Sequence, residues 1–377
     1  MLKKLVVVFI LGLFLFQGSG VEAVDIGGEF ELGSSYDLDG DESARVVSDL
    51  ELGIGRSTFS EAFQVNLGFM TDWPDGETDF EIRDAYFDYY GADFDLRAGK
   101  QLVTWGTATG YNPTDNINPI NLDDPTGDKD SRLLLKGDYF IDRSYRLTGF
   151  LAPFHESLFS GELEMAAAGE ALPVEEVENE LGNVEYGLKF AGRGVEGFDF
   201  SFSLISGHEQ IPTISYQETP MGPVPESAYF REYLILGADM ATTYQGFGLW
   251  AEGALMMPDA GDNYGSLVLG ADYNLESGQL ILGQLIYNRG RLSQDDNYIL
   301  HQAVEGSFAD YHSYRLASFY NLSTDGYIVR PGLEFSLADA IGLELEYIYQ
   351  KGEVMMQGFD LGSQDRNQVS ASISYSF

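Results

Sequence analysis

Hydrophobic and polar residues alternate position by position along much of this chain. In the C-terminal stretch NQVSASISYSF, apolar or small residues fill every second position from Val369 to Phe377, and Gln or Ser fills the positions between them. Successive side chains of a β-strand point to opposite faces, so this pattern predicts a ribbon with one apolar and one polar face. The same alternation recurs at 61–71, 197–207 and 327–337, which predicts a protein built from β-strands.

The connections between the predicted strands follow a regular rhythm. Short turns such as 142–144 and 242–244 alternate with longer polar loops such as 106–130 and 154–181. This asymmetry is typical of bacterial transmembrane barrels, whereas a soluble β-sandwich has no reason to keep it. The predicted strands lie near 25–33, 44–56, 61–71, 79–90, 93–105, 131–141, 145–153, 182–193, 197–207, 229–241, 245–257, 263–274, 278–289, 311–322, 327–337, 342–351 and 366–377.

The predicted segments number seventeen. Single-chain bacterial barrels have an even number of strands, so one segment is either missing or wrongly assigned. A weak strand around 297–307 would give eighteen, and removal of one segment would give sixteen. The sequence therefore predicts an all-β fold: a single transmembrane antiparallel β-barrel of 16–18 strands, with eighteen favoured.

The N-terminus has the three parts of a secretory signal peptide. Two lysines precede the apolar run 5–16, and Val-Glu-Ala at 21–23 supplies a cleavage site. We assign 1–23 to the signal peptide and 24–377 to the barrel. No later stretch holds eighteen consecutive apolar residues, so no transmembrane helix is expected. The expected location is the outer membrane of a diderm bacterium.

The composition excludes several classes of protein. The chain has 60 acidic against 21 basic residues and a formal charge of −39, which opposes nucleic-acid binding. It has no cysteine, and therefore no disulfide or thiolate metal site. No cofactor or metal site is predicted from motif spacing, and no enzyme motif is found. The acidity is compatible both with a cation-preferring lumen and with adaptation to high salt.

The last residue carries a second signal. The chain ends on Phe377, with Tyr375 two positions earlier. This ending resembles the assembly signal of outer-membrane barrels, and the resemblance implies outer-membrane lipid and the barrel-assembly machinery as partners.

A barrel of this predicted width leaves an aqueous channel, which indicates passive diffusion of small polar solutes or ions. In general diffusion porins the loop after the fifth strand folds into the lumen, and by that resemblance we expect 106–130 to be a constriction loop. The alternative is a surface loop over the rim. The acidic residues of this loop are Asp115, Asp123, Asp124, Asp128 and Asp130.

Basic residues gather on the neighbouring strands. Strand parity places Arg97 with Gln101, and Arg132 with Lys136, on lumen faces. A basic wall opposite an acidic loop would set up a transverse field across the pore. The alternative is that these cations pair with nearby carboxylates such as Asp138. The predicted pore-lining basic residues are Arg97, Lys100, Arg132, Lys136 and Arg146.

The stretch from 80 to 153 resembles a group of poorly characterised porin-like outer-membrane barrels. The shared pattern is Gly-Lys/Arg-Gln on a strand, then Trp-Gly, then Asn-Pro-x-Asp and Asn-Pro. The resemblance implies an outer-membrane channel and brings no substrate. The matching positions are Gly99, Lys100, Gln101, Trp105, Gly106, Asn112, Pro113, Asp115, Asn118 and Pro119.

Three further functions remain open. A substrate-specific channel, for a sugar or an organic anion, is the first alternative to general diffusion. A structural or an enzymatic outer-membrane barrel is the second. A homotrimer is an analogy with general porins.

Overall fold

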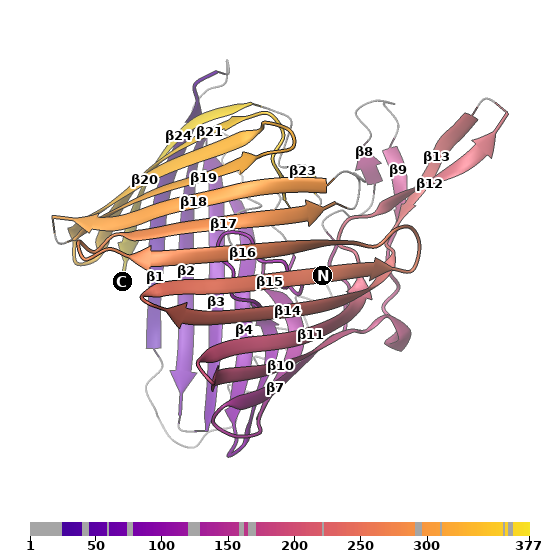
Figure 1. The fold of residues 1–377 in the computed structure, drawn as a ribbon, viewed down its shortest axis with the longest axis horizontal. Coiled ribbons are helices and arrows are strands. Elements are labelled where there is room, and N and C mark those ends of the chain that lie inside the picture. Colours follow the sequence, from indigo (N-terminus) through magenta and orange to yellow (C-terminus); the bar gives the residue numbers. More distant parts are fainter. Residues whose placement is uncertain are drawn as a thin grey trace.

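The computed structural model describes residues 25–39, 45–58, 60–73, 78–119, 129–157, 162–164, 171–220, 222–290, 296–309, 311–356, 359–360 and 365–377. These residues form one antiparallel sheet of eighteen strands that closes into a barrel (Figure 1). The sheet closes because β1 (Asp25–Asp37) pairs with both β2 (Arg45–Ser57) and β24 (Arg366–Ser376). The predicted signal peptide, 1–23, lies outside the described residues.

The barrel strands follow one another in chain order, and eighteen is the number favoured by the sequence. The weak strand expected around 297–307 is β18 (Asp296–Phe308), which pairs along its length with β17 and β19. The remaining barrel strands are β3 (Glu61–Trp73), β4 (Thr78–Tyr90), β5 (Phe94–Gln101), β6 (Arg132–Phe140), β7 (Tyr145–Ala152), β10 (Glu185–Val195), β11 (Phe198–His208), β14 (Glu232–Tyr244), β15 (Phe247–Pro258), β16 (Tyr264–Asn274), β17 (Leu280–Arg289), β19 (His312–Asn321), β20 (Tyr327–Ala338) and β21 (Ile341–Lys351).

The two ends of the barrel differ in their connections. At one end the strands join through short turns, such as Gln245–Gly246 between β14 and β15, where both residues have positive φ. Positive φ at both positions gives a tight hairpin whose twist matches that of the strands. At the other end, long connections carry short strands of their own: β8 (Glu162–Glu164), β9 (Ala171–Glu175), β12 (Thr213–Thr219), β13 (Gly222–Tyr229), β22 (Met355–Met356) and β23 (Phe359–Asp360), with one 3₁₀ turn, η1 (Leu181–Asn183). Of these, β12 and β13 project beyond the barrel in Figure 1.

The two faces of the sheet have opposite character. On β17, Ile281 and Leu285 are 43% and 42% exposed on the outside, whereas Gln284 and Ile286 are buried inside. Exposed large apolar side chains recur in this way on most strands. Soluble monomers rarely expose apolar patches above a few hundred Å², and an outward apolar band is what a lipid-facing barrel requires.

The buried core lies inside the barrel and is formed jointly by the wall and by the chain that follows β5. One cluster includes Trp105, Ile117 and Ile205, and a second includes Tyr111 and Ile286. No helix in the described part of the chain is both long and apolar enough to span a bilayer.

Candidate functional site

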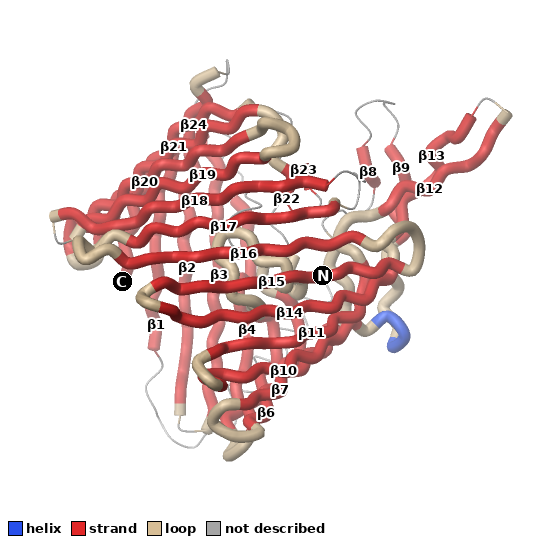
Figure 2. Tube along the Cα trace, in the orientation of Figure 1, coloured by secondary structure: helices blue, strands red, loops and turns tan. Residues whose placement is uncertain are grey.

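Residues 102–119, called here the inward segment, leave β5 and lie inside the barrel against its far wall. The backbone N–H groups of Thr107 and Ala108 donate to Glu252 on β15, at 2.7 and 2.8 Å. The N–H of Thr109 donates to Gln284 on β17 at 3.3 Å. Along the sheet, β6, β7, β10, β11 and β14 separate β5 from β15, so these contacts cross the interior. Figure 2 shows the segment in tan behind β15 and β16.

Glu252 is the main anchor of the inward segment. Its side chain is almost fully buried, and besides Thr107 and Ala108 it accepts from the N–H and hydroxyl of Thr114, at 2.9 and 3.0 Å. A buried carboxylate is costly unless it is fully hydrogen-bonded, and here the donors come from the backbone of one segment. The carboxylate therefore depends on the docked segment, and the segment depends on the carboxylate.

Apolar packing holds the inward segment on both sides of this anchor. The Trp105 ring contacts Phe150 edge-on, with centroids 5.6 Å apart, and Nζ of Lys189 lies 5.7 Å from the centre of the Trp105 ring. Farther along, the Tyr111 hydroxyl hydrogen-bonds that of Ser266 at 2.6 Å. Inward-facing apolar residues of the wall such as Phe150, Ile205 and Ile286 belong to the same buried clusters as this segment.

The positions of the sequence motif form the frame of the segment. Asn118 joins its two ends: its Oδ1 accepts from the N–H of Val103 at 3.0 Å, and its Nδ2 donates to the carbonyl of Asp130 at 2.9 Å. Gln101, fully buried, donates to the carbonyl of Leu134 at 3.1 Å. The frame is thus held by side-chain amides that pair with backbone groups.

The glycines and prolines of the motif have local roles. Gly99 has φ +135°, and a Cβ there would collide with the Ala85 carbonyl. Gly106 has φ +101° and lies against Asn112. Pro113 and Pro119 are buried, and their carbonyls accept hydrogen bonds from Asn116 and Asp130.

The described acidic residues of loop 106–130 are Asp115 and Asp130. Asp115 is buried, with one carboxylate oxygen 3.1 Å from Nζ of Lys129. Burial, with the nearby Glu81 adding to it and Lys100 opposing it, raises the pKa of Asp130 above its usual value. The other predicted acidic positions, Asp123, Asp124 and Asp128, lie outside the described residues.

Each predicted basic residue lies beside a carboxylate of the barrel wall. Arg97 also stacks over the Tyr86 ring at 3.9 Å. Lys100 lies opposite Leu133 in the strand register and directly follows Gly99, which has φ +135°. The role of these residues in lining the pore stays a prediction. The pairs are Arg97–Asp88 at 2.6 Å, Lys100–Glu81 at 2.9 Å, Arg132–Glu185 at 2.5 Å, Lys136–Asp138 at 2.8 Å and Arg146–Asp138 at 3.6 Å.

Sequence reasoning missed the residues that receive the inward segment. The alternation along β15 is compatible with a lumen-facing Glu252 but indicates none of its partners, and no sequence pattern singles out Gln284. Gln284 also accepts from the Trp250 indole at 2.8 Å and contacts Nδ1 of His301 at 2.8 Å. Buried polar residues at inward positions of β15–β18 were the available signal.

Part of the interior remains open. A cavity of about 610 Å³ lies along β18 to β21, on the side away from β5 to β7. Four carboxylates and two guanidinium groups line it. They are Glu305, Glu334, Glu344, Glu346, Arg315 and Arg330. A second cavity, of about 270 Å³, shares Glu344 and Glu346 and adds Glu31.

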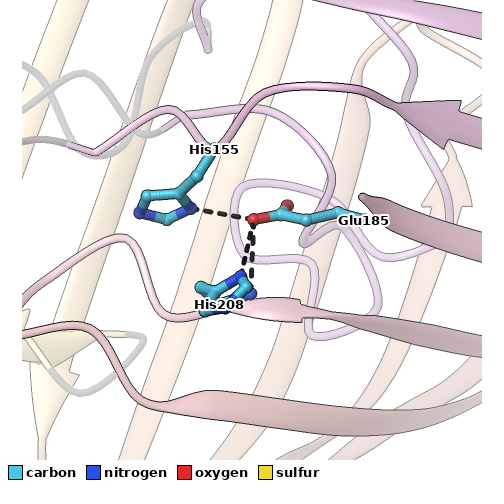
Figure 3. A group of neighbouring side chains, drawn as sticks. All are labelled: His155, Glu185 and His208. Atoms are coloured by element: carbon cyan, nitrogen blue, oxygen red, sulfur yellow. Dashed lines mark hydrogen bonds and ion pairs between the residues drawn. The ribbon is translucent and has the colours of Figure 1, made fainter. Parts of the chain in front are cut away.

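One group of described residues has the donor atoms for a metal ion. His155, Glu185 and His208 each offer a ligand atom, and these atoms lie within 4.8 Å of one another. Figure 3 shows the two imidazole rings facing the same carboxylate. The group lies at the loop end of the barrel, after β7, at the start of β10 and at the end of β11.

Comparisons with known proteins identify the fold. No protein-family model matches the chain, and no curated protein matches its sequence significantly. Among solved structures, it is similar to Pseudomonas aeruginosa OccK5 (OpdH), with TM-score 0.60 and 8% identity over 94% of this chain and 98% of that chain. It is also similar to P. aeruginosa OccK11 (OpdR), with TM-score 0.56 and 9% identity over 94% and 95%. A mutant of the Rh. blastica porin aligns with TM-score 0.47 and 14% identity over 94% and 100%. At these identities the OccK matches show a shared fold, the closed antiparallel β-barrel.

Proposed function

We propose that the chain is an outer-membrane channel through which small polar solutes and ions diffuse passively. The observation that carries this proposal is a closed eighteen-stranded barrel with an apolar exterior and a partly open interior. Wall side chains cannot fill a barrel of this width, so water enters it. The inward segment takes up one side of the lumen and narrows it, and the cavity along β18–β21 is the remaining path.

The charge of the open path favours cations. Four carboxylates against two guanidinium groups leave a local excess of negative charge, and Glu31 adds to it in the adjoining cavity. Rings or rows of carboxylates select cations in membrane pores. We infer that cations and neutral polar solutes pass more readily than anions.

The basic residues of β5 to β7 have a different role in this proposal. Each lies close to a wall carboxylate, and the described loop residue Asp115 pairs with Lys129. These contacts favour mutual neutralisation of the charges within the wall. They argue against a transverse field between an acidic loop and a basic wall. A specific site for an organic anion at these cations is the second candidate, and the same measurements address it.

The remaining expectations belong to this proposal as well. We also propose export through the signal peptide and assembly through Tyr375 and Phe377. A trimeric state and kinship with the porin-like group that the stretch 80–153 resembles are proposed in the same way. Catalysis is not part of the proposal, and no cofactor is proposed.

Planar-bilayer recording of the refolded protein tests the function. A stable open conductance with modest cation preference is expected, and absence of conductance would refute the channel. The variant Glu31→Gln/Glu344→Gln should lower the cation-to-anion permeability ratio by about twofold to tenfold, since one charge at 4 Å in water is worth about 1 kcal/mol. The matched variant Arg97→Gln/Lys136→Gln alters the basic wall: an unchanged ratio supports neutralisation, and a large shift supports the transverse field.

A further inference from the structure

We propose that His155, Glu185 and His208 form a binding site for a divalent transition-metal ion of the zinc type. None of the three residues lines the cavity along β18 to β21, so this proposal does not rest on the channel function. It joins three chain segments at the loop end of the barrel: the connection after β7, the first residue of β10 and the last residue of β11. Figure 3 shows how the three side chains converge.

The spacing of the donor atoms fits a tetrahedral ion. Nδ1 of His155 lies 2.8 Å from Oε1 of Glu185, and Nδ1 of His208 lies 3.5 Å from the same oxygen. Zinc bonds of about 2.0–2.2 Å require ligand atoms about 3.3 Å apart in a tetrahedron. The observed separations lie on both sides of that value, so small side-chain rotations admit the ion. Two imidazoles and one carboxylate leave a fourth position for water, as in open zinc sites.

The three side chains are buried, so the site is preorganised for an ion. The side chains of His155, Glu185 and His208 are 5%, 4% and 9% exposed. Both Nε2 of His155 and Nδ1 of His208 are buried and make no well-formed hydrogen bond in the described ranges; the latter has only the long 3.5 Å contact with Oε1 of Glu185. Buried polar atoms are normally paired, and an unpaired one calls for an explanation. A metal bond from the imidazole lone pair of His208, which already faces the carboxylate, supplies one.

The surroundings orient the carboxylate ligand. Its second oxygen, Oε2, accepts from Arg132 at 2.5 Å, which leaves Oε1 toward the two imidazoles. Ligating carboxylates are commonly held by such supporting hydrogen bonds. A Cβ at Gly207 would lie 2.8 Å from the Glu185 carboxyl carbon, so glycine makes room for this side chain. The neighbouring charges Glu209 and Arg231 pair with each other at 2.6 Å.

The expected consequence of binding is a tighter loop end. The ion would join positions 155, 185 and 208, and Arg132 extends the contact to the inward segment through the Ile117 carbonyl at 3.1 Å. The ion is therefore proposed as a clamp on the pore mouth.

Equilibrium dialysis of the refolded, chelator-treated protein against ZnCl₂ tests the site. One Zn²⁺ per chain is expected, with a rise in the unfolding temperature. His155→Asn and His208→Asn should each weaken binding by more than about tenfold, since loss of even a supporting residue costs about 10- to 100-fold. His312→Asn, a histidine change on β19 away from the group, is the matched control and should leave binding unchanged.

Two results would overturn the proposal: no saturable binding by the wild type, or binding retained when both His155 and His208 are replaced. If the double variant fails to fold, Co²⁺ bound to the wild type decides, because its visible absorption distinguishes a tetrahedral from an octahedral site. An octahedral spectrum, or the same spectrum after His208→Asn alone, would also overturn it. Channel conductance takes no part in these measurements, so their failure leaves the proposed function untouched.

Discussion

The hydrogen bonds of Glu252 give a direct prediction for the inward segment. In Glu252→Ala, three backbone N–H groups lose their acceptor, and the Thr114 hydroxyl keeps only Oδ1 of Asn112 at 3.4 Å. A buried donor without an acceptor costs about 1–3 kcal/mol, so a segment that stayed docked would carry at least about 3 kcal/mol. Removal of the buried carboxylate returns part of this, because its own desolvation cost disappears. We expect a net loss of about 2–4 kcal/mol in the free energy of docking.

Single-channel recording and thermal unfolding measure this loss. A factor of ten in population corresponds to about 1.4 kcal/mol, so the undocked segment becomes about 30- to 1,000-fold more populated. The conductance of Glu252→Ala should rise, or fluctuate between a wild-type and a larger level, and the unfolding temperature should fall. Glu252→Gln keeps one acceptor oxygen, so its conductance and its unfolding temperature should lie between those of the wild type and Glu252→Ala.

The matched control is Glu334→Ala on β20, a lumen carboxylate that accepts from Ser313 at 2.9 Å. It should alter ion preference without a comparable rise in conductance. An equal rise in both variants would mean that loss of lumen charge, and not undocking, enlarges the current. Unchanged conductance and stability in Glu252→Ala would refute the anchoring role itself.

Three further changes test other parts of the structure. Asn118→Ala removes the link between Val103 and the end of the loop, so we expect a loss of about 1–3 kcal/mol in the free energy of unfolding. Limited proteolysis within the loop should become faster, and an unchanged cleavage rate would contradict the link. Gly99→Val puts a β-branched residue at a positive φ against the Ala85 carbonyl, and the yield of refolded barrel should drop sharply, whereas Ala98→Val should refold like the wild type. Phe377→Ala should lower assembly in cells, measured as the folded fraction in the outer membrane. The purified barrel should melt almost normally, because the hydrogen bonds of Phe377 with Gly28 are made by its backbone and its ring, stacked on Tyr375, is 54% exposed; a strongly lowered melting temperature would show a structural role instead.

The alternation of residues determined the barrel without help from tertiary information. A period of two is a local property of a strand, so the ranges and the two faces could be read from neighbouring residues. The weak strand β18 was predicted only because single-chain bacterial barrels have an even number of strands, and the alternation alone left sixteen as well as eighteen open. The predicted range of 93–105 for β5 was too long, because the strand ends at Gln101 where the chain turns into the lumen.

Only the tertiary structure decided what the inward residues contact. Glu252 binds backbone groups of Thr107 and Thr114, which lie 145 and 138 positions away along the chain. His155 meets His208 only because β7, β10 and β11 lie side by side and bring their ends together. Parity assigns such residues to the lumen, but the partner depends on the path of a loop without a periodic pattern. The sequence by itself therefore determined the barrel and its sides, while the docked segment, the ion pairs of the wall and the histidine–carboxylate group follow from contacts across the closed interior and around its rim.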